Sequence, residues 1–326
     1  MPNVHLTIAT MDYDHVRDFR EGRVAASGID ATWLNLGLHE MFARFLANRE
    51  WDVSELSFAK FIAEATRPDS DIIGLPVFPR REFRFGIIYV NRARGIRHPE
   101  DLRGKRIGLP EWAQTATVYT RGALVHDFNV PLAEVEWVQA GINEKGRVEK
   151  VDIELPPGVR LTPVADRSLS DMLDTGAIDA LMGASVPECF GKNPDVVRLF
   201  PDFRAMDERF YKRTRVHPIM HIIAVRKAVL ENDPWIARNL YNAFDAAKER
   251  SLKRLRHSGH FALPWHAEHA ASMQELFGGN YFPYGVEENR AALELFLRFA
   301  YEQGIARRHV EPEEIFPSGI MVSGHV

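Results

Sequence analysis

The sequence contains a single cysteine, Cys189, and this scarcity excludes two kinds of structure. One thiol cannot form a disulfide within the chain or supply a cysteine-built metal site, which suits a reducing compartment. The sequence also lacks an apolar run near the roughly 20 residues that span a bilayer, and it has no internal repeat and no low-complexity tract. We therefore expect a protein without a membrane segment.

The chain also lacks an excess of positive charge. It has 41 lysines and arginines against 45 aspartates and glutamates, which gives a net charge of −4. Neither the net charge nor any basic block favours nucleic acid as a partner. Residues 1–15 run directly into an alternating strand pattern without a basic and apolar leader, so we expect a cytoplasmic protein. A mature form from which a signal peptide had been removed would begin in the same way.

The sequence does contain enough apolar material for two domain-sized lobes. It has 326 residues, of which 45% are hydrophobic and 26% charged. Strand patterns alternate with helical ones, and this βαβ order predicts an α/β fold. The segment 142–164 is rich in glycine, proline and charge, and we predict a surface excursion there. Strands are expected in 4–9, 51–57, 71–78, 104–110, 135–141, 178–184 and 219–227, and helices in 38–48, 58–62, 114–128, 169–176, 234–255, 266–278 and 286–304.

Several phrases of the sequence carry a family resemblance. HPEDLRGKRIGLPE (98–111), the LxxMLxxGxIDAL pattern (169–181) and RKAVLENDPWIARNLYNAF (226–244) are similar to the type 2 periplasmic binding protein superfamily. Within it, four further stretches resemble the 4,5-dihydroxyphthalate decarboxylase family, and the likeness spans nearly the whole chain. They are DVSELSFAKF (52–61), LPVFPRREFRFGIIYVN (75–91), HPIMHIIAVRK (217–227) and NYFPYGVEENRAALELFLRFAYEQG (280–304).

The resemblance implies two α/β lobes with a ligand cleft between them. Two crossing strands, expected near Phe85–Asn91 and Pro218–Val225, would join the lobes and act as a hinge. Residues 1–90 and 217–326 would then form one lobe, and residues 91–216 the other.

Three arginines interrupt an apolar stretch, in GLPVFPRREFRFGIIYVN (74–91). Arginine keeps its charge in a protein, so burying Arg80, Arg81 and Arg84 together requires internal carboxylates or an anionic ligand. Alternation along an extended strand sends Arg80 and Arg84 to one face and Arg81 to the other. We predict that Arg80 and Arg84 bind a ligand carboxylate and that Arg81 pairs with a surface acid. The candidate acids are Glu82, Asp69 and Asp71.

A second candidate anion-binding site is LPEWAQTAT (109–117), where a strand leads into a helix. Unpaired N–H groups and hydroxyls in the first helical turn favour an anion, so Thr115 is a candidate substrate-binding residue. Trp112 would cover an aromatic ring, with a place in the core as the alternative. Glu111 beside an anion site would repel the ligand unless it is protonated or carries a proton, which makes it a candidate catalytic residue.

The sequence His217-Pro218-Ile219-Met220-His221 places two imidazoles on one side of an extended strand. We predict a catalytic role for His221 and substrate binding by His217, with buried structural histidines as the alternative. Glu55 and Ser57 end one predicted strand and Asp12 follows another, at the edge where open α/β sheets bind ligands. Glu55 is a candidate proton carrier, and Ser57 and Asp12 are candidate substrate-binding residues, unless they cap the helices that follow.

The family resemblance implies a carboxy-lyase of aromatic compound degradation, which converts a 4,5-dihydroxyphthalate-like acid to a protocatechuate-like product and CO₂. Protonation of the ring carbon avoids an aryl carbanion, and an ionised para hydroxyl supplies the electrons, so we predict no cofactor. A divalent metal chelated by the catechol oxygens stays open. Its candidate ligands are Glu55, Glu111, His217 and His221.

The alternative function is a solute-binding protein for a small aromatic or other carboxylate, feeding a transporter. In either case the expected partner is a small carboxylate, with no nucleic acid and no membrane, and a homo-oligomer stays open. The titratable groups among the anion-binding candidates favour the enzyme.

Overall fold

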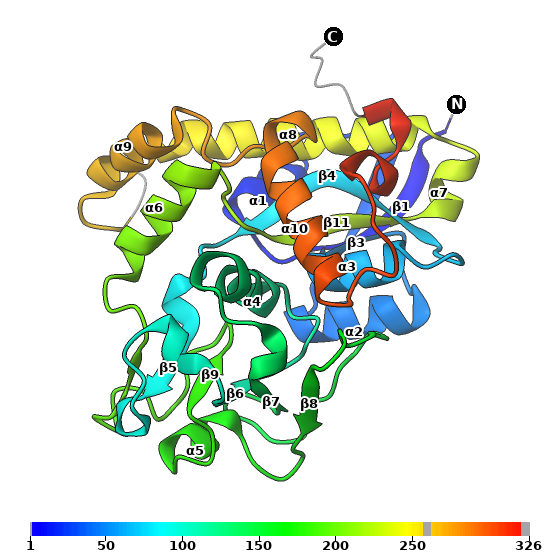
Figure 1. Cartoon of the computed structure of the whole chain (residues 1–326). Helices are drawn as coiled ribbons and strands as arrows, with labels where there is room; N and C mark the ends of the chain where they lie inside the picture. The colour runs from blue at the N-terminus through cyan, green and yellow to red at the C-terminus, as the bar shows by residue number, and fades with distance from the viewer. Residues whose placement is uncertain (1, 257–261, 321–326) are drawn as a thin grey trace.

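The computed structural model describes residues 2–256 and 262–320. Two sheets organise this part of the chain, one above the other in Figure 1. The first has the strand order β2-β1-β3-β11-β4, in which β1 is parallel to β2 and β3 while β11 is antiparallel to both its neighbours. Its strands are β1 (Val4–Ala9), β2 (Ile29–Leu34), β3 (Val53–Ser57), β4 (Ile72–Arg81) and β11 (Ile219–Arg226).

The second sheet has the order β10-β5-β9-β6-β7-β8. Strands β9, β6, β7 and β8 run parallel to one another, whereas β5 is antiparallel to both of its neighbours. Its strands are β5 (Ile88–Asn91), β6 (Arg106–Leu109), β7 (Glu136–Gln139), β8 (Arg160–Pro163), β9 (Ala180–Met182) and β10 (Val196–Arg198). The predicted two-sheet α/β fold is therefore confirmed.

The chain passes twice between the sheets. It leaves the first sheet at Arg81 and joins the second at Ile88, and it returns from β10 through α6 (Phe203–Thr214) to β11. The two sheets thus draw their strands from 4–81 with 219–226, and from 88–198. The exact division into lobes at residues 90 and 216 stays a prediction.

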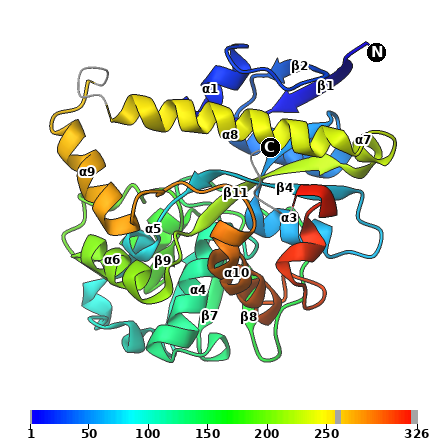
Figure 2. The same cartoon turned by 90° about the horizontal axis from the view of Figure 1, so that it is seen from above.

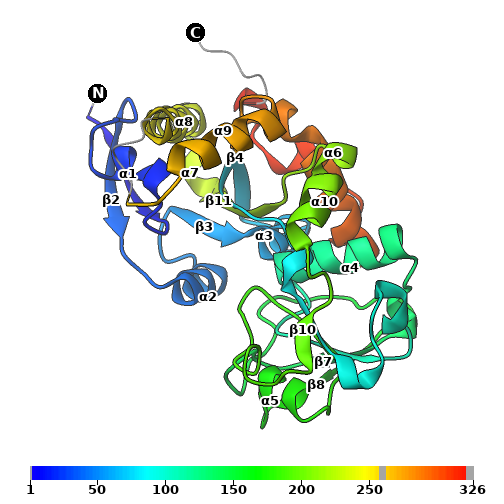
Figure 3. The ribbon, with the colours of Figure 1, turned by 90° about the vertical axis from the view of Figure 1, so that its left-hand side faces the viewer.

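The helices cover the sheets and fill the space between them. In Figure 3, α4 lies between the two sheets, with α10 beside it. In Figure 2 the long α8 runs across the first sheet, next to α1. The other helices are α1 (Asp14–Arg20), α2 (Leu38–Asn48), α3 (Phe58–Ala65), α4 (Thr115–Phe128), α5 (Leu169–Asp174), α7 (Lys227–Glu231), α8 (Trp235–Leu255), α9 (His266–Phe277) and α10 (Arg290–Glu302).

Close packing of α4 against α10 joins the two halves of the molecule. A Cβ at Gly122 would lie 2.2 Å from a ring carbon of Phe299, so only glycine permits this approach. Next to it, the Gln303 side chain accepts a hydrogen bond from Arg121 Nε at 2.8 Å and donates one to the Val118 carbonyl at 3.0 Å. These buried contacts tie α4 to the turn that follows α10.

The predicted surface excursion at 142–164 is only partly correct. Residues Arg160–Pro163 form β8, which extends the second sheet beside β7. Val151 is buried and Arg147 lines a cavity described below. The glycine, proline and charge of this segment hid a short edge strand, because such strands carry little apolar pattern of their own.

Strand β3 is unusual for a central strand. All five of its residues are buried, but three of them, Ser54, Glu55 and Ser57, are polar. The neighbouring β11 is almost entirely apolar, as expected for a strand covered on both faces. Burying polar groups costs free energy unless they are hydrogen-bonded, so β3 indicates where a functional site lies.

Candidate active site

A cavity of about 80 Å³ lies where the ends of β3, β4 and β11 meet the loops of the second sheet. Four of the lining side chains are cationic, two are imidazoles and one is a carboxylate. The lining residues are Leu38, His39, Phe42, Ser57, Lys60, Arg80, Arg84, Glu111, Gln114, Thr115, Ala116, Arg147, Ala184, Met220 and His221. Such a lining favours an anionic ligand.

On the first-sheet side, His221 is held by the buried carboxylate of Glu55. Nδ1 of His221 lies 2.5 Å from Glu55 Oε1. The hydroxyl of Tyr13 donates to the same oxygen at 2.7 Å, and the Met11 N–H donates to Oε2 at 2.8 Å. With Nδ1 engaged in this way, Nε2 is the ring nitrogen that remains for chemistry in the cavity that His221 lines.

The protonation of this cluster follows from its partners. Burial would raise the pKa of Glu55, but hydrogen bonds from His221, Met11 and Tyr13 and the charge of His221 keep that pKa below its ordinary value. Burial and the neighbouring Glu55 raise the pKa of Tyr13, so the phenol stays protonated and donates. Glu55 is therefore an ionised acceptor that orients the imidazole.

On the opposite side, Glu111 is surrounded by cations. Its carboxylate is fully buried, bonds the ammonium of Lys60 and accepts from Arg147 Nε at 2.7 Å, with Lys150 Nζ at 3.9 Å. Burial would raise the pKa of Glu111, but the charges of Lys60 and Arg147 lower it below the ordinary value. In this arrangement Glu111 is an anion that positions two cations, which does not favour the predicted role of proton carrier.

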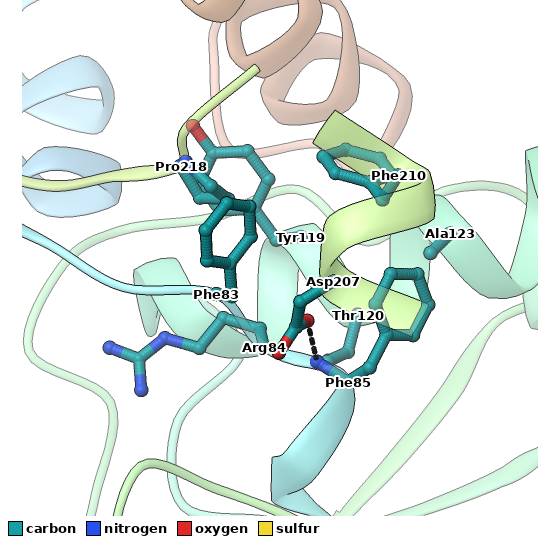
Figure 4. A pocket seen from close by; sticks show the side chains of 9 residues that line it. All are labelled: Phe83, Arg84, Phe85, Tyr119, Thr120, Ala123, Asp207, Phe210 and Pro218. Carbon is teal, nitrogen blue, oxygen red and sulfur yellow. Dashed lines mark hydrogen bonds between the residues drawn. The ribbon is translucent and has the colours of Figure 1, made fainter. Parts of the chain in front are cut away.

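The two predicted arginines both line the cavity. Arg80 and Arg84 share one acid, since both contact Glu82 Oε2, and Arg84 Nε also donates to Met220 Sδ at 3.0 Å. Strand β4 ends at Arg81 and the backbone of Arg84 is not extended, so the predicted alternation does not apply to Arg84, although both side chains reach the cavity. Figure 4 shows that the guanidinium of Arg84 extends away from a small neighbouring apolar pocket, in which Asp207 accepts a hydrogen bond from the Phe85 N–H.

The prediction for Arg81 is wrong. Its side chain is not at the surface with an acid but is buried, and it donates to the carbonyl oxygens of His217 and Pro283 and to Asn289 Oδ1. Three oxygen acceptors of partial charge take the place of a carboxylate. Burial lowers the pKa of Arg81 to about 10, so the side chain stays charged at neutral pH.

Ser57 and Thr115 lie at the N-termini of two helices that meet at the cavity. Ser57 precedes α3 and Thr115 begins α4, and their hydroxyl oxygens lie 2.9 Å apart. Thr115 Oγ1 also accepts from the Ala59 N–H at 3.0 Å. The positive ends of both helix dipoles thus add to the cationic character of the lining.

Three predicted binding residues do not line this cavity. Trp112 is in the core, where its indole donates to the Gln303 carbonyl and stacks on the guanidinium of Arg121. The His217 ring stacks on Phe83, and burial together with the charge of Arg81 lowers its pKa to about 3. Asp12 is exposed, near Arg17 and Arg20. For Trp112 the core alternative is the correct one.

The four candidate metal ligands make different contacts and do not face a common point. Glu55 holds His221, Glu111 holds cations, and His217 packs against aromatic rings. In the part of the chain that the structure describes, no group of three His, Cys, Asp or Glu side chains is placed to hold a metal ion. These residues therefore do not form the proposed ligand set.

Lys60 and Arg147 are site residues that the sequence interpretation missed. Lys60 is buried in α3, where residues 58–63 are all buried, and a lysine inside such a run is a signal that was present in the sequence. Arg147 lies in the glycine-rich and charged segment before β8 and carried no such signal. Its place depends on how that segment folds back on Glu111.

Comparison with known proteins identifies the family. A 4,5-dihydroxyphthalate decarboxylase of Comamonas testosteroni is 34% identical over 320 residues, which cover 97% of this chain and 97% of that protein. A second one, from Pseudomonas putida, is 35% identical over 214 residues, or 65% of this chain and 83% of that protein. No protein-family model matches the chain. None of the helices within residues 2–256 and 262–320 is long and apolar enough to span a membrane.

Solved structures of solute-binding proteins share the fold. The periplasmic aliphatic sulphonate binding protein SsuA from Escherichia coli has a TM-score of 0.54 at 13% identity, covering 98% of this chain and 99% of that one. The alkanesulfonate-binding protein SsuA from Xanthomonas axonopodis pv. citri has a TM-score of 0.50 at 11% identity, covering 97% and 99%. At such low identity the likeness concerns the fold alone. With 34% identity to a relative over almost its whole length, the chain belongs to the 4,5-dihydroxyphthalate decarboxylase family and has a type 2 periplasmic-binding-protein-like fold.

Proposed function

We propose that the protein decarboxylates a hydroxylated aromatic acid, with 4,5-dihydroxyphthalate or a close analogue as substrate. The observation that carries this proposal is the pairing of buried Glu55 with His221, which lines a cavity together with four cationic side chains. The cations match an aromatic dianion, and the imidazole supplies a group that can donate and accept a proton. Homology to the two decarboxylases supports the same chemistry.

The cationic lining binds and activates the substrate. Arg80 and Arg84 hold a carboxylate, and the positive field of the cavity favours ionisation of a ring hydroxyl. The phenolate para to the departing carboxylate pushes electron density onto the ring carbon that bears it. No external electron sink is required for this step.

His221 then provides the proton. With Nδ1–H donating to Glu55, a protonated His221 transfers its Nε2 proton to the ring carbon, which becomes tetrahedral. The carbon–carboxylate bond breaks, CO₂ leaves, and its electron pair restores the aromatic ring and the phenolate. One proton is consumed and one CO₂ released, so the imidazole must take a proton from solvent before the next turnover. Glu55 stabilises the charged imidazole between these steps.

A second function, solute binding without turnover, is favoured by the likeness of the fold to the two sulphonate-binding proteins. The same cavity would serve it, because a cationic lining binds carboxylates whether or not they react. Only turnover separates the two functions.

The test is a turnover assay on the purified protein. Incubation with 4,5-dihydroxyphthalate should release CO₂ and form the monocarboxylic catechol in equal amounts, with the same rate in the presence of a metal chelator. Tight binding of 4,5-dihydroxyphthalate without release of CO₂ would favour the solute-binding function over the decarboxylase. A rate that chelator abolishes and added divalent metal restores would overturn the cofactor-free mechanism.

A further inference from the structure

The segment 143–159, here called the bridge segment, connects β7 to β8 and is fastened to the turn that follows α10. The Glu154 N–H donates to the Gly304 carbonyl at 3.0 Å. Arg307 Nη2 donates to Asp152 at 2.5 Å, and its Nη1 lies 3.5 Å from Glu154. A Cβ at Gly304 would lie 1.5 Å from the Glu154 carbonyl oxygen, so this docking requires glycine at position 304. The bridge segment therefore has a defined path.

This path brings Arg147 to the cavity. Its Nε donates to the buried Glu111 at 2.7 Å, and its side chain, 26% exposed, lines the cavity. Among the described residues only Nε of this guanidinium has a hydrogen-bond partner, so both Nη nitrogens remain as donors for a ligand. Glu111 thus fixes the direction of the group without using its outer edge.

The other cations of the lining are more fully engaged. Arg80 and Arg84 share Glu82, and Lys60 is buried against Glu111. His221 lies opposite Arg80 in the register of β11 and β4, whereas the anchor of Arg147, Glu111, follows β6 of the second sheet. The first-sheet side of the cavity therefore carries His221 and Arg80, Arg84 follows on the connection that leaves this sheet, and Arg147 comes from the second-sheet side.

We propose that Arg147 is a specificity-determining residue, which binds the carboxylate that a dicarboxylate substrate retains. One carboxylate then lies near His221, Arg80 and Arg84, and the second lies at the free edge of Arg147 on the second-sheet side. This inference rests on the proposed function for the identity of the substrate, and it predicts a preference for benzene dicarboxylates over monocarboxylates.

The test compares binding of phthalate and benzoate by calorimetry, in the wild-type protein and in Arg147→Gln. A hydrogen bond to a charged group is worth about 10- to 100-fold in affinity, so the wild type should bind phthalate tighter than benzoate by about that factor. Arg147→Gln should lose most of this preference and keep its affinity for benzoate. Arg147→Lys, which retains the charge without the planar fork, should recover part of it.

The control is Arg160→Gln, which removes the same charge from an exposed side chain at the start of β8. It should leave both affinities unchanged. The inference fails if the wild type does not prefer phthalate, if Arg147→Gln weakens both ligands equally, or if Arg160→Gln has the same effect. Turnover of 4,5-dihydroxyphthalate, measured separately, distinguishes this failure from that of the proposed function. Turnover without a preference for dicarboxylates would contradict only the role of Arg147. A preference for dicarboxylates without turnover would contradict only the proposed decarboxylase function.

Discussion

Glu55 and Glu111 are both fully buried carboxylates beside the same cavity, yet their partners differ completely. Glu55 accepts hydrogen bonds from an imidazole, a phenol and a backbone N–H, whereas Glu111 is bound by an ammonium and a guanidinium. Both have a pKa below the ordinary value, so both are ionised, but only Glu55 is hydrogen-bonded to an imidazole, which can carry a proton. The comparison teaches that partners, not burial, assign one carboxylate to proton handling and the other to placing charge.

The largest expected effect comes from removing the imidazole on the Glu55 side. His221→Asn should lower kcat by about 10²–10⁴-fold, the usual contribution of general acid catalysis, with a much smaller change in substrate affinity. The limb of the pH–rate profile that reports the imidazole should also disappear. His126→Asn is the control, because His126 lies on α4 and pairs with Glu302. Near-normal turnover in a folded His221→Asn protein would place the proton transfer elsewhere.

A matched pair of substitutions separates the two carboxylates. Glu111→Gln removes the ion-pair partner of Arg147 and, among the described residues, leaves Lys60 with only the more distant Glu149, at 3.9 Å. It should lower the free energy of unfolding by about 3 kcal/mol, the usual result of breaking a buried ion pair. Because the pKa of Glu111 is lowered, this stabilisation is complete above about pH 5 and is lost in acid, so the penalty should shrink there. Urea denaturation of both proteins at several pH values measures this difference in the free energy of unfolding.

Glu55→Gln should give the opposite pattern, a larger loss in kcat and a smaller loss in stability. The amide oxygen can accept from Tyr13 in place of Oε1, while the amide nitrogen then faces the Met11 N–H, and no permanent cation is left unpaired. The amide no longer stabilises a charged His221. Equal losses in both quantities for the two variants would mean that the carboxylates have the same role.

Asp207 is a buried carboxylate that, in the part of the chain described, neither an imidazole nor a cation contacts directly, and its hydrogen-bond donor is the Phe85 N–H. Burial raises its pKa to about 7, against the pull of the Phe85 N–H and Arg84. The folded protein therefore holds a proton that the unfolded chain has lost between about pH 4 and pH 7, and the free energy of unfolding falls as pH rises through that window. Relative to wild type, Asp207→Asn should gain about 1–2 kcal/mol between pH 5 and pH 8, a value reduced for partial solvent screening. An unchanged difference between the two proteins at both pH values would contradict the raised pKa.

The sequence predicted more of the fold than of the site. The helix at Leu38–Asn48 and the strand at Val4–Ala9 match their predicted bounds, because their apolar periodicity is complete within a few residues. The edge strand β8 was missed, since it has one half-buried position and little pattern to detect. Helices and strands with a strong apolar period can therefore be predicted from the sequence, whereas a short edge strand such as β8 forms because a neighbouring strand pairs with it.

The site required contacts that no local pattern contains. His221, Arg80 and Arg84 were predicted from charge and histidine placed in apolar strands, and all three line the cavity. The acceptors of Arg81 could not be predicted locally, because two of them, Pro283 and Asn289, lie about 200 residues further along the chain. Arg147 likewise depends on the docking of the bridge segment.

The smallest expected effect concerns Glu82, the exposed counterpart of Glu111. Both carboxylates hold two cations, but Glu82 has 40% of its side chain exposed, and an exposed ion pair contributes about 0–1 kcal/mol. Since Glu82 occupies Arg80 and Arg84, a substrate carboxylate must compete with it, and Glu82→Gln should tighten phthalate binding by up to about fivefold. High salt should remove this gain because it screens exposed charges, whereas the stability loss in Glu111→Gln should persist. Glu208→Gln breaks another ion pair near the surface, with Arg204 on α6, and should leave binding unchanged. Weaker phthalate binding in Glu82→Gln would instead mean that Glu82 orients the two arginines as Glu111 orients Arg147, and burial would then no longer distinguish the two carboxylates.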